Sequence, residues 1–320
     1  MRILAVSDGR RGIENQALGL AEAVAREVGE SASVATYVLD HGSVFAALPP
    51  SLQLARQSDF GLPDADLVVG CGRQAVAPLI SLQRAGSPAF TVFVQDPRTE
   101  PSRFDLVVAP EHDGLDGPFV EPIIGSPNRV TEARIVTGTL AEFERLSRLS
   151  MPRAALMIGG DSRTHRMDGA AVTDHLQAAN DLRALGHSLL ITTSRRTPDA
   201  AQQAWEDFAR GAEDVWLHTP DSDGLNPYFA FLGGADVLLV TEDSTNMLTE
   251  ACTTGKPVFR LSMGGQPGKF AQLYARLAER CNVRVWDGEV DAIEYDPLDE
   301  TERAAKVVVA RMRKRLPGEV

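Results

Sequence analysis

Short apolar runs alternate with helical patterns from one end of the chain to the other. In the first half, the runs that predict strands are 2–6, 33–39, 66–70, 90–94 and 105–109. In the second half, they are 154–160, 188–193, 214–218, 236–240 and 257–261. Runs rich in Val, Leu and Ile that are separated by helices are typical of a parallel sheet covered on both faces. The pattern therefore predicts an α/β protein with two Rossmann-like domains that face a cleft.

The alternation is interrupted between residues 130 and 152. The segment IIGSPNRVT, which precedes this interval, contains Gly, Pro and Asn, and a helical segment follows it before the second series of strands begins. We predict a first domain at 1–135 and a second at 136–320, with the last helix able to cross back to the first. Ligands of open α/β sheets bind beyond the carboxyl ends of the strands, so the loops after strands are where function is expected.

Composition and charge exclude several classes of protein. The chain has 320 residues and a formal net charge of −12, which leaves no positive field to attract nucleic acid. Its three cysteines and six histidines show no metal-ligand spacing, so neither a metal nor a cofactor is predicted. The apolar run 3–6 is too short for a signal peptide, and no stretch approaches the roughly 20 apolar residues of a membrane span. We expect a cytoplasmic protein.

Polar loops follow the first two strands of the second domain. After 154–160 comes GGDSRTHRM, whose glycines let the chain turn closely and whose hydroxyl and arginine groups can meet a diphosphate. After 188–193 comes TTSRRTP, again with hydroxyl and basic groups. Each loop alone is more often solvated than functional, but polar loops at successive strand ends favour a binding site. The candidates from these loops are Gly160, Ser162, Arg163, Thr193, Ser194 and Arg195.

The segment VTEDSTNMLTEACTTGKPVF predicts a buried strand, a polar turn and a short helix over 245–254. The helical period puts one set of residues toward the sheet and another on the polar side. The first set is Met247, Leu248, Ala251 and Cys252, and the second is Asn246, Thr249, Glu250 and Thr253. Free N–H groups of the first turn can hold phosphates, while Glu250 can accept two hydrogen bonds from a ribose diol. Ordinary capping by Asp243 or Ser244 and a solvated glutamate are the alternatives.

The first strand ends in SDGRRGIENQ, a small polar loop that opens onto an amphipathic helix. Such a loop is either an anion site or a tight turn. It matches neither the Walker loop nor G-x-G-x-x-G, which disfavours a nicotinamide enzyme.

Four segments together resemble the elongated-mitochondria family, which lies in the GT-B glycosyltransferase-like superfamily. They are SDGRRGIENQALGLAEA, GGDSRTHRM, TTSRRTP and NPYFAFLGGADVLLVTEDSTNMLTEACTTGKPVF. The similarity covers nearly the whole chain, and the last segment is its most specific part. The family comprises a plant mitochondrial-fission factor and many bacterial proteins that are often labelled as sugar-nucleotide epimerases.

The resemblance implies a GT-B-like fold whose interdomain cleft holds a nucleoside-diphosphate sugar. It implies that Ser244, Thr245 and Asn246 approach the diphosphate and that Glu250 approaches the ribose. It also implies that Gly160, Ser162 and Thr193 form the floor of the nucleotide site.

One departure from the GT-B pattern concerns catalysis. Many GT-B enzymes place a histidine in the loop after the first strand, where this chain has Ile13 and no histidine. Asp8 and Asp96, which both follow strands of the first domain, are the candidates for the base. The leading hypothesis is a glycosyltransferase with an unknown acceptor. A sugar-nucleotide epimerase is the second, and a non-catalytic nucleotide-sugar-binding or scaffold protein, as the plant resemblance implies, is the third.

The segment 300–317 is basic on an otherwise acidic protein. A solvated terminal helix is one interpretation. The other is contact with an anionic membrane surface, as basic amphipathic helices make. The second would suit a lipid-linked acceptor and a place at the periphery of the inner membrane.

Overall fold

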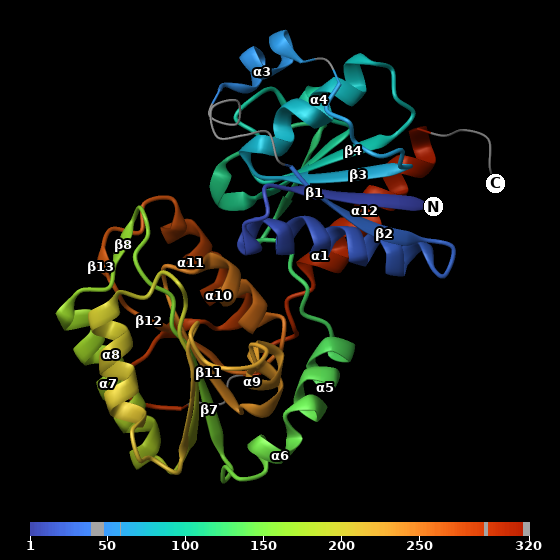
Figure 1. The fold of residues 1–320 in the computed structure, drawn as a ribbon. Coiled ribbons are helices and arrows are strands. Elements are labelled where there is room, and N and C mark those ends of the chain that lie inside the picture. The colour runs from blue at the N-terminus through green and yellow to red at the C-terminus, as the bar shows by residue number, and fades with distance from the viewer. Residues whose placement is uncertain (40–47, 58, 291–293, 316–320) are drawn as a thin grey trace. The chain divides into compact units, whose positions relative to one another are not determined.

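The chain folds into two compact units, each with its own parallel sheet (Figure 1). The computed structural model describes residues 1–39, 48–57, 59–290 and 294–315. The first unit is formed by Met1–Arg129 together with Asp299–Val320, and the second by Val130–Leu298. The predicted α/β class with two parallel sheets is confirmed.

The first unit has six parallel strands in the order β2-β1-β3-β4-β5-β6. They are β1 (Arg2–Ser7), β2 (Ser33–Val38), β3 (Leu67–Cys71), β4 (Phe90–Val94), β5 (Leu106–Pro110) and β6 (Val120–Ile123). The five predicted strands are present with ends shifted by at most one residue. The prediction missed β6 because Glu121 and Pro122 interrupt its short apolar run. A proline is tolerated there because β6 is the edge strand.

Two layers of helices enclose the first sheet (Figure 1). One face packs against α1 (Arg11–Val28) and α12 (Glu300–Arg315), through side chains such as Leu20 and Val308. The other packs against α4 (Val76–Arg84), and the remaining helical pieces lie in the connections. These pieces are α3 (Pro50–Arg56), η1 (Arg73–Ala75), η2 (Pro101–Arg103) and η3 (Glu111–Asp113).

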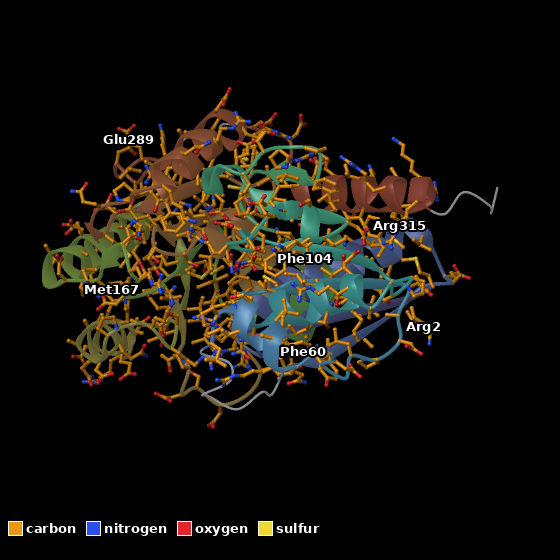
Figure 2. The ribbon with its side chains drawn as sticks, turned by 90° about the horizontal axis from the view of Figure 1, so that it is seen from above. Arg2, Phe60, Phe104, Met167, Glu289 and Arg315 are labelled. Atoms are coloured by element: carbon orange, nitrogen blue, oxygen red, sulfur yellow. The ribbon has the colours of Figure 1, made fainter. Side chains whose placement is uncertain are left out.

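The basic helix α12 belongs to the first unit, although it is the last segment of the chain. Its apolar side is buried against α1 and the sheet. Arg303 pairs with Glu300 and Glu121, and these carboxylates raise the pKa of its guanidinium. Arg315, labelled in Figure 2, donates to Asp105 Oδ2 at 2.5 Å. Part of the positive charge of this helix therefore serves to fix it on the sheet.

The second unit also has six parallel strands, in the order β10-β9-β7-β11-β12-β14. They are β7 (Arg153–Met157), β9 (Ser188–Thr192), β10 (Val215–His218), β11 (Val237–Thr241), β12 (Val258–Leu261) and β14 (Arg284–Val285). A small antiparallel pair, β8 (His165–Arg166) and β13 (Gly264–Gly265), joins two loops. The five predicted strands are present, although β7 ends at Met157 rather than at residue 160. The two-residue β14 is too short for an apolar pattern to reveal.

Helices cover both faces of the second sheet. One face packs against α7 (Gly169–Ala184) and α8 (Asp199–Ala209), with Trp205 fully buried between them and the strands. Figure 1 shows α9 on the opposite side of the sheet from α7 and α8, with α5 beside it. The remaining helices are α5 (Glu132–Ala141), α6 (Phe143–Leu146), α9 (Tyr228–Gly234), α10 (Thr245–Cys252) and α11 (Phe270–Cys281).

Within the described parts of the chain, no helix combines the length and the apolar character that a membrane span requires.

Candidate functional site

The strand order of the second sheet creates a switch point between β7 and β11. These strands are neighbours in the sheet, and the chain continues outward from them in opposite directions. Open α/β sheets bind ligands just beyond the carboxyl ends of the two strands at such a point. Gly159 and Gly160 follow β7, and Asp243 and Ser244 follow β11. The loops chosen from sequence therefore include the two that the topology brings together here.

The two glycines after β7 are required by close packing of the loops. A Cβ at Gly159 would lie 2.3 Å from the carboxylate of Asp243, and one at Gly160 would lie 1.9 Å from the carbonyl oxygen of Arg196. The backbone N–H of Gly159 donates to Thr241 Oγ1 at 2.7 Å, and that of Gly160 donates to Asp243 Oδ2 at 3.1 Å. A larger residue at Gly159 would displace the buried carboxylate of Asp243, and one at Gly160 would displace the backbone of the loop that contains Arg196.

Arg196 and Asp243 connect three strand-end loops. The side chain of Asp243 is fully buried, and its Oδ2 atom lies 2.7 Å from Arg196 Nη2. The Nη1 atom of Arg196 donates to the carbonyl oxygens of Gly160 and Asp161. Almost half of the arginine side chain remains exposed, so its guanidinium can also meet a ligand anion. Among the described residues, Asp243 Oδ1 has no hydrogen-bond partner.

The first turn of α10 begins at the same place. Ser244 is its N-cap residue, and its Oγ atom accepts a hydrogen bond from the backbone N–H of Met247 at 3.4 Å. Thr245 and Asn246 follow and are half-buried. Positive partial charge from the aligned peptide groups gathers at a helix N-terminus, which favours an anion there.

The two sides of α10 differ from the predicted pattern at Thr249 and Met247. Leu248, Ala251 and Cys252 are fully buried, as the helical period predicts. Thr249, which the pattern puts on the polar side, is also fully buried and donates its hydroxyl to the carbonyl oxygen of Thr245 at 2.8 Å. Met247 is only half-buried. The buried side of the helix is thus rotated toward Thr249, which a threonine tolerates because its hydroxyl bonds within the helix.

Glu250 lies in the second turn of α10 and is half-buried. Its Oε2 atom accepts a hydrogen bond from the hydroxyl of Tyr228 at 2.5 Å. Burial raises the pKa of Glu250 to about 7, although the hydrogen bond from Tyr228 acts in the opposite direction. Tyr228 was absent from the sequence candidates, because its contact with Glu250 spans 22 residues and no local pattern reveals it.

Of the remaining candidates from the second domain, some are held by hydrogen bonds and others are exposed. Thr193 is buried and donates to Gln202 Oε1 at 2.7 Å, and Ser194 donates to the carbonyl oxygen of Gly159 at 3.0 Å. The Oγ atom of Ser162 accepts from two backbone N–H groups of its own turn. Arg163 and Arg195 are exposed. The structure thus brings Ser194 to the glycine loop, and it directs Arg196 rather than Arg195 onto that loop.

The switch point of the first sheet lies between β1 and β3, and the two candidate bases follow β1 and β4. Asp8 follows β1, its side chain is only 3% exposed, and Arg10 donates to its Oδ2 atom through Nε at 2.9 Å and Nη2 at 2.6 Å. Asp96 follows β4 and pairs with Arg98 Nε at 3.0 Å. Each carboxylate is therefore engaged by an arginine two residues further along the chain.

A buried polar cluster lies at the same edge of the first sheet. Gln16 of α1 accepts a hydrogen bond from Gln95 Nε2 at 2.8 Å and a longer one from Cys71 Sγ at 3.7 Å. Burial raises the pKa of the Cys71 thiol, so the cysteine is a neutral donor there. Gln95 and Arg98 have positive φ angles of 81° and 56°, which residues other than glycine adopt infrequently.

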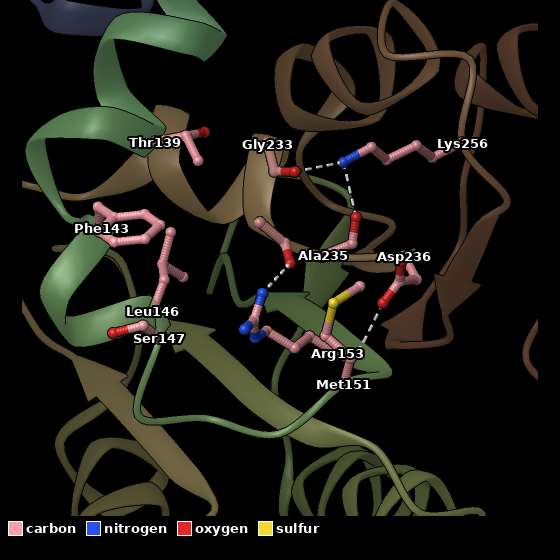
Figure 3. Close-up of a pocket in the computed structure, with 11 residues that line it drawn as sticks. Thr139, Phe143, Leu146, Ser147, Met151, Arg153, Gly233, Ala235, Asp236 and Lys256 are labelled. Carbon is pink, nitrogen blue, oxygen red and sulfur yellow. Dashed lines mark hydrogen bonds between the residues drawn. The ribbon is translucent and has the colours of Figure 1, made fainter.

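The second unit has a cavity of about 490 Å³ at the opposite, amino-terminal edge of its sheet (Figure 3). Lys256 lies in its wall and donates to the carbonyl oxygens of Leu232, Gly233 and Ala235, which end α9. Arg153 is similarly occupied by backbone carbonyls at its Nε and Nη atoms. Backbone carbonyl oxygens thus occupy Lys256 and Arg153, so we place the candidate site at the other edge. Within the described ranges, no group of three or more His, Cys, Asp and Glu residues has a metal-binding arrangement.

Comparison with known families gives a decisive match. The family model described as mitochondrial fission ELM1 matches residues 11–312. The chain belongs to this family. The mitochondrial fission protein ELM1 of Arabidopsis thaliana is 27% identical over 277 residues, which are 78% of this chain and 64% of the plant protein. The chain thus spans less than two thirds of that relative.

Solved structures confirm the GT-B-like fold. The UDP-GlcNAc 2-epimerase of Methanocaldococcus jannaschii has a TM-score of 0.59 and 11% identity, with 97% of this chain and all of that chain covered. The UDP-GlcNAc 2-epimerase of Neisseria meningitidis, solved bound to UDP-GlcNAc, has a TM-score of 0.57 and 14% identity, with 98% and 100% covered. At such identities the likeness establishes the fold of this ELM1-family chain and leaves its chemistry to be argued from its own residues.

Proposed function

We propose that this ELM1-family protein binds a nucleoside-diphosphate sugar at the carboxyl edge of its second sheet and transfers the sugar to an acceptor. The proposal rests on one observation above all. The N-terminus of α10, the glycine loop after β7 and the guanidinium of Arg196 meet at the switch point, with Glu250 one turn further along α10. The N–H groups and the arginine suit a diphosphate, and the carboxylate suits a ribose.

The ligand contacts follow from the positions of these groups. In our proposal, Ser244, Thr245 and Asn246 approach the diphosphate with the first turn of α10, while Gly160 lets the backbone come close to it. The exposed Arg163 and Arg195 add positive charge around the phosphates. Ser162, Thr193 and Ser194 support the floor of this site through their hydrogen bonds.

Transfer needs a base on the acceptor side, for which we propose Asp8 or Asp96 of the first domain, taken as 1–135. Both carboxylates are held by arginines, so the acceptor hydroxyl must displace or share that pairing before a proton can move. Epimerisation of the same ligand is the second candidate, favoured by the two 2-epimerases whose fold the chain shares. The third is binding without turnover, which the ion-paired state of both acids favours.

Thermal unfolding with a panel of ligands tests the proposal. A ligand that binds only the folded state raises the unfolding temperature by mass action. We expect UDP, ADP, GDP or CDP, or one of their sugar conjugates, to raise it, and inorganic phosphate to have a smaller effect. Failure of all of them at millimolar concentration would reject the proposal. Chromatography of the incubated nucleotide sugar then separates transfer or hydrolysis from epimerisation and from binding alone.

Glu250→Ala provides the residue-level test. Loss of the ribose hydrogen bonds should cost about 1.5–3 kcal/mol, roughly ten- to a hundred-fold in affinity. Leu248→Ala is the control. Truncation of this fully buried side chain should lower the stability by about 2–5 kcal/mol and change the affinity little.

A lipid-linked acceptor and a peripheral place at the inner membrane remain part of the proposal. Lys306, Arg313 and Lys314 of α12 are exposed and can meet anionic headgroups. Sedimentation with vesicles that contain anionic lipid should retain the parent protein and release a variant with all three residues changed to Gln. Equal sedimentation of the two would remove this helix from the proposal.

A further inference from the structure

A hydrogen bond joins the start of α9 to α10 beside the candidate site. Tyr228 is the first residue of α9, and its hydroxyl donates to Glu250 Oε2 at 2.5 Å. In the part of the chain that is described, no lysine or arginine pairs with this carboxylate, and the structure gives Oε1 no partner. Glu250 is half-buried rather than sealed, so Oε1 is available to a ligand.

The pair is costly to keep for structure alone. A carboxylate taken out of water without a cation destabilises the folded state, and burial accordingly raises the pKa of Glu250 to about 7. A glutamine would accept the same hydrogen bond from Tyr228 without a charge. A carboxylate at this position therefore points to a ligand that needs a strong acceptor.

We propose that Tyr228 is a positioning residue for Glu250, and that the pair makes the site selective for ribonucleotides over 2′-deoxyribonucleotides. The inference rests on the proposed function. The tyrosine hydroxyl fixes Oε2 and with it the plane of the carboxylate, which leaves Oε1 to accept from a ribose hydroxyl. A carboxylate oxygen has two lone pairs, so Oε2 can accept from a second ribose hydroxyl as well.

The preference for ribonucleotides follows because a 2′-deoxy ligand would leave a carboxylate oxygen of Glu250 without a hydrogen-bond donor. A site built to bond a hydroxyl rejects an analogue that lacks it, because the protein acceptor is then buried without a partner. We expect the 2′-deoxy ligand to bind at least about ten-fold more weakly than its ribo counterpart.

The affinity should also depend on pH, because only the ionised carboxylate accepts from both hydroxyls. On the elements around α10, Arg260 of β12 pairs with Glu242, and Tyr274 of α11 donates to the backbone of Glu242. Of the titratable groups in the described chain, Tyr228 is the one whose hydrogen bond acts on Glu250. The affinity should fall as the pH falls and Glu250 takes up a proton. Since the hydrogen bond from Tyr228 favours the ionised carboxylate, removal of this bond should move that fall in affinity to higher pH.

The experiment is calorimetric titration of the parent and of Tyr228→Phe between pH 6 and 8.5. The probe is whichever of UDP, ADP, GDP and CDP binds the parent most tightly, together with its 2′-deoxy counterpart. We expect Tyr228→Phe to weaken ribonucleotide binding about five- to ten-fold at pH 7. We also expect the midpoint of the pH profile to rise and the preference for ribose to shrink.

Tyr295→Phe is the matched control. Tyr295 is also half-buried in the second unit and donates its hydroxyl to the carbonyl oxygen of Lys256 at 2.6 Å. Its loss should leave the nucleotide affinity, the pH midpoint and the ribose preference unchanged.

The outcomes separate this inference from the proposed function. Nucleotide binding by the parent with equal affinity for the ribo and deoxy forms would overturn the inference and leave the proposed site standing; this comparison needs no variant. A profile for Tyr228→Phe that superimposes on the parent profile would do the same. No binding of any probe by the parent would reject both.

Discussion

Replacing Glu250 by glutamine should make the protein more stable at alkaline pH, although it should weaken nucleotide binding. The substitution keeps the size of the side chain and an oxygen for the Tyr228 hydroxyl, and it removes the charge. The unperturbed pKa is 4.5 and the folded-state pKa is about 7. At about 1.4 kcal/mol per pKa unit, the full shift corresponds to about 3.5 kcal/mol. Because Glu250 retains some exposure to water, we expect about 1–3 kcal/mol.

The direction follows from proton binding. Between pH 4.5 and about 7, the folded state holds a proton on Glu250 that the unfolded chain has lost. Its contribution to stability is therefore present in full below pH 4.5 and is lost as pH rises through 7. Glutamine does not titrate, so the difference in stability between Glu250→Gln and the parent should grow in favour of the variant from pH 4.5 to pH 8.

Urea unfolding of the parent and of Glu250→Gln at four pH values from 5 to 8, followed at the transition of the second unit, measures this difference in stability. Glu206→Gln is the control, because Glu206 is exposed on α8 of the same unit. Its stability should follow that of the parent at every pH. Parallel stability curves for the parent and Glu250→Gln across this range would refute the argument that Glu250 is ionised at a cost to the fold.

Two further predictions concern the glycine loop and the candidate bases. Gly160→Ala should cost about 3 kcal/mol in thermal unfolding, because its Cβ would lie 1.9 Å from the backbone oxygen of Arg196. Gly169→Ala, where a Cβ meets nothing within 4 Å, should cost little, and equal losses in the two variants would contradict the packing argument. Asp8→Asn or Asp96→Asn should abolish most turnover of a bound nucleotide sugar and leave its affinity near that of the parent. Parent rates in both variants would remove the only candidates for the base.

The sequence predicts the strands well because parallel strands buried on both faces have continuous apolar runs. Both series of five strands could be read from such runs, whereas β6 and β14 could not, since one contains a proline and the other has two residues. The order of strands in each sheet has no signature in a single sequence. Only the structure identifies β7 and β11 as the strands at the switch point.

The candidate site was predictable where a residue acts through its own turn or helix. Local spacing places Glu250 on α10 and limits the N-cap to Asp243 or Ser244, of which the structure selects Ser244. Local spacing could not decide between Arg195 and Arg196, because two adjacent residues in a turn point in different directions. The turn after β9 directs Arg196 onto the loop after β7, and only tertiary packing determines this.

Two carboxylates near the start of α10, the fully buried Asp243 and the half-buried Glu250, have different surroundings. Asp243 is neutralised by Arg196 and receives the N–H of Gly160, so it holds the strand-end loops together. Glu250 has a tyrosine hydroxyl and no cation among the described residues, so in our proposal its charge is left for a ligand to engage. If the polar start of this helix served only to cap it, Ser244, which accepts a hydrogen bond from the N–H of Met247, would be sufficient for that role. Our proposal of a ligand site explains an uncompensated acid one turn beyond this serine, whereas a capped turn alone does not.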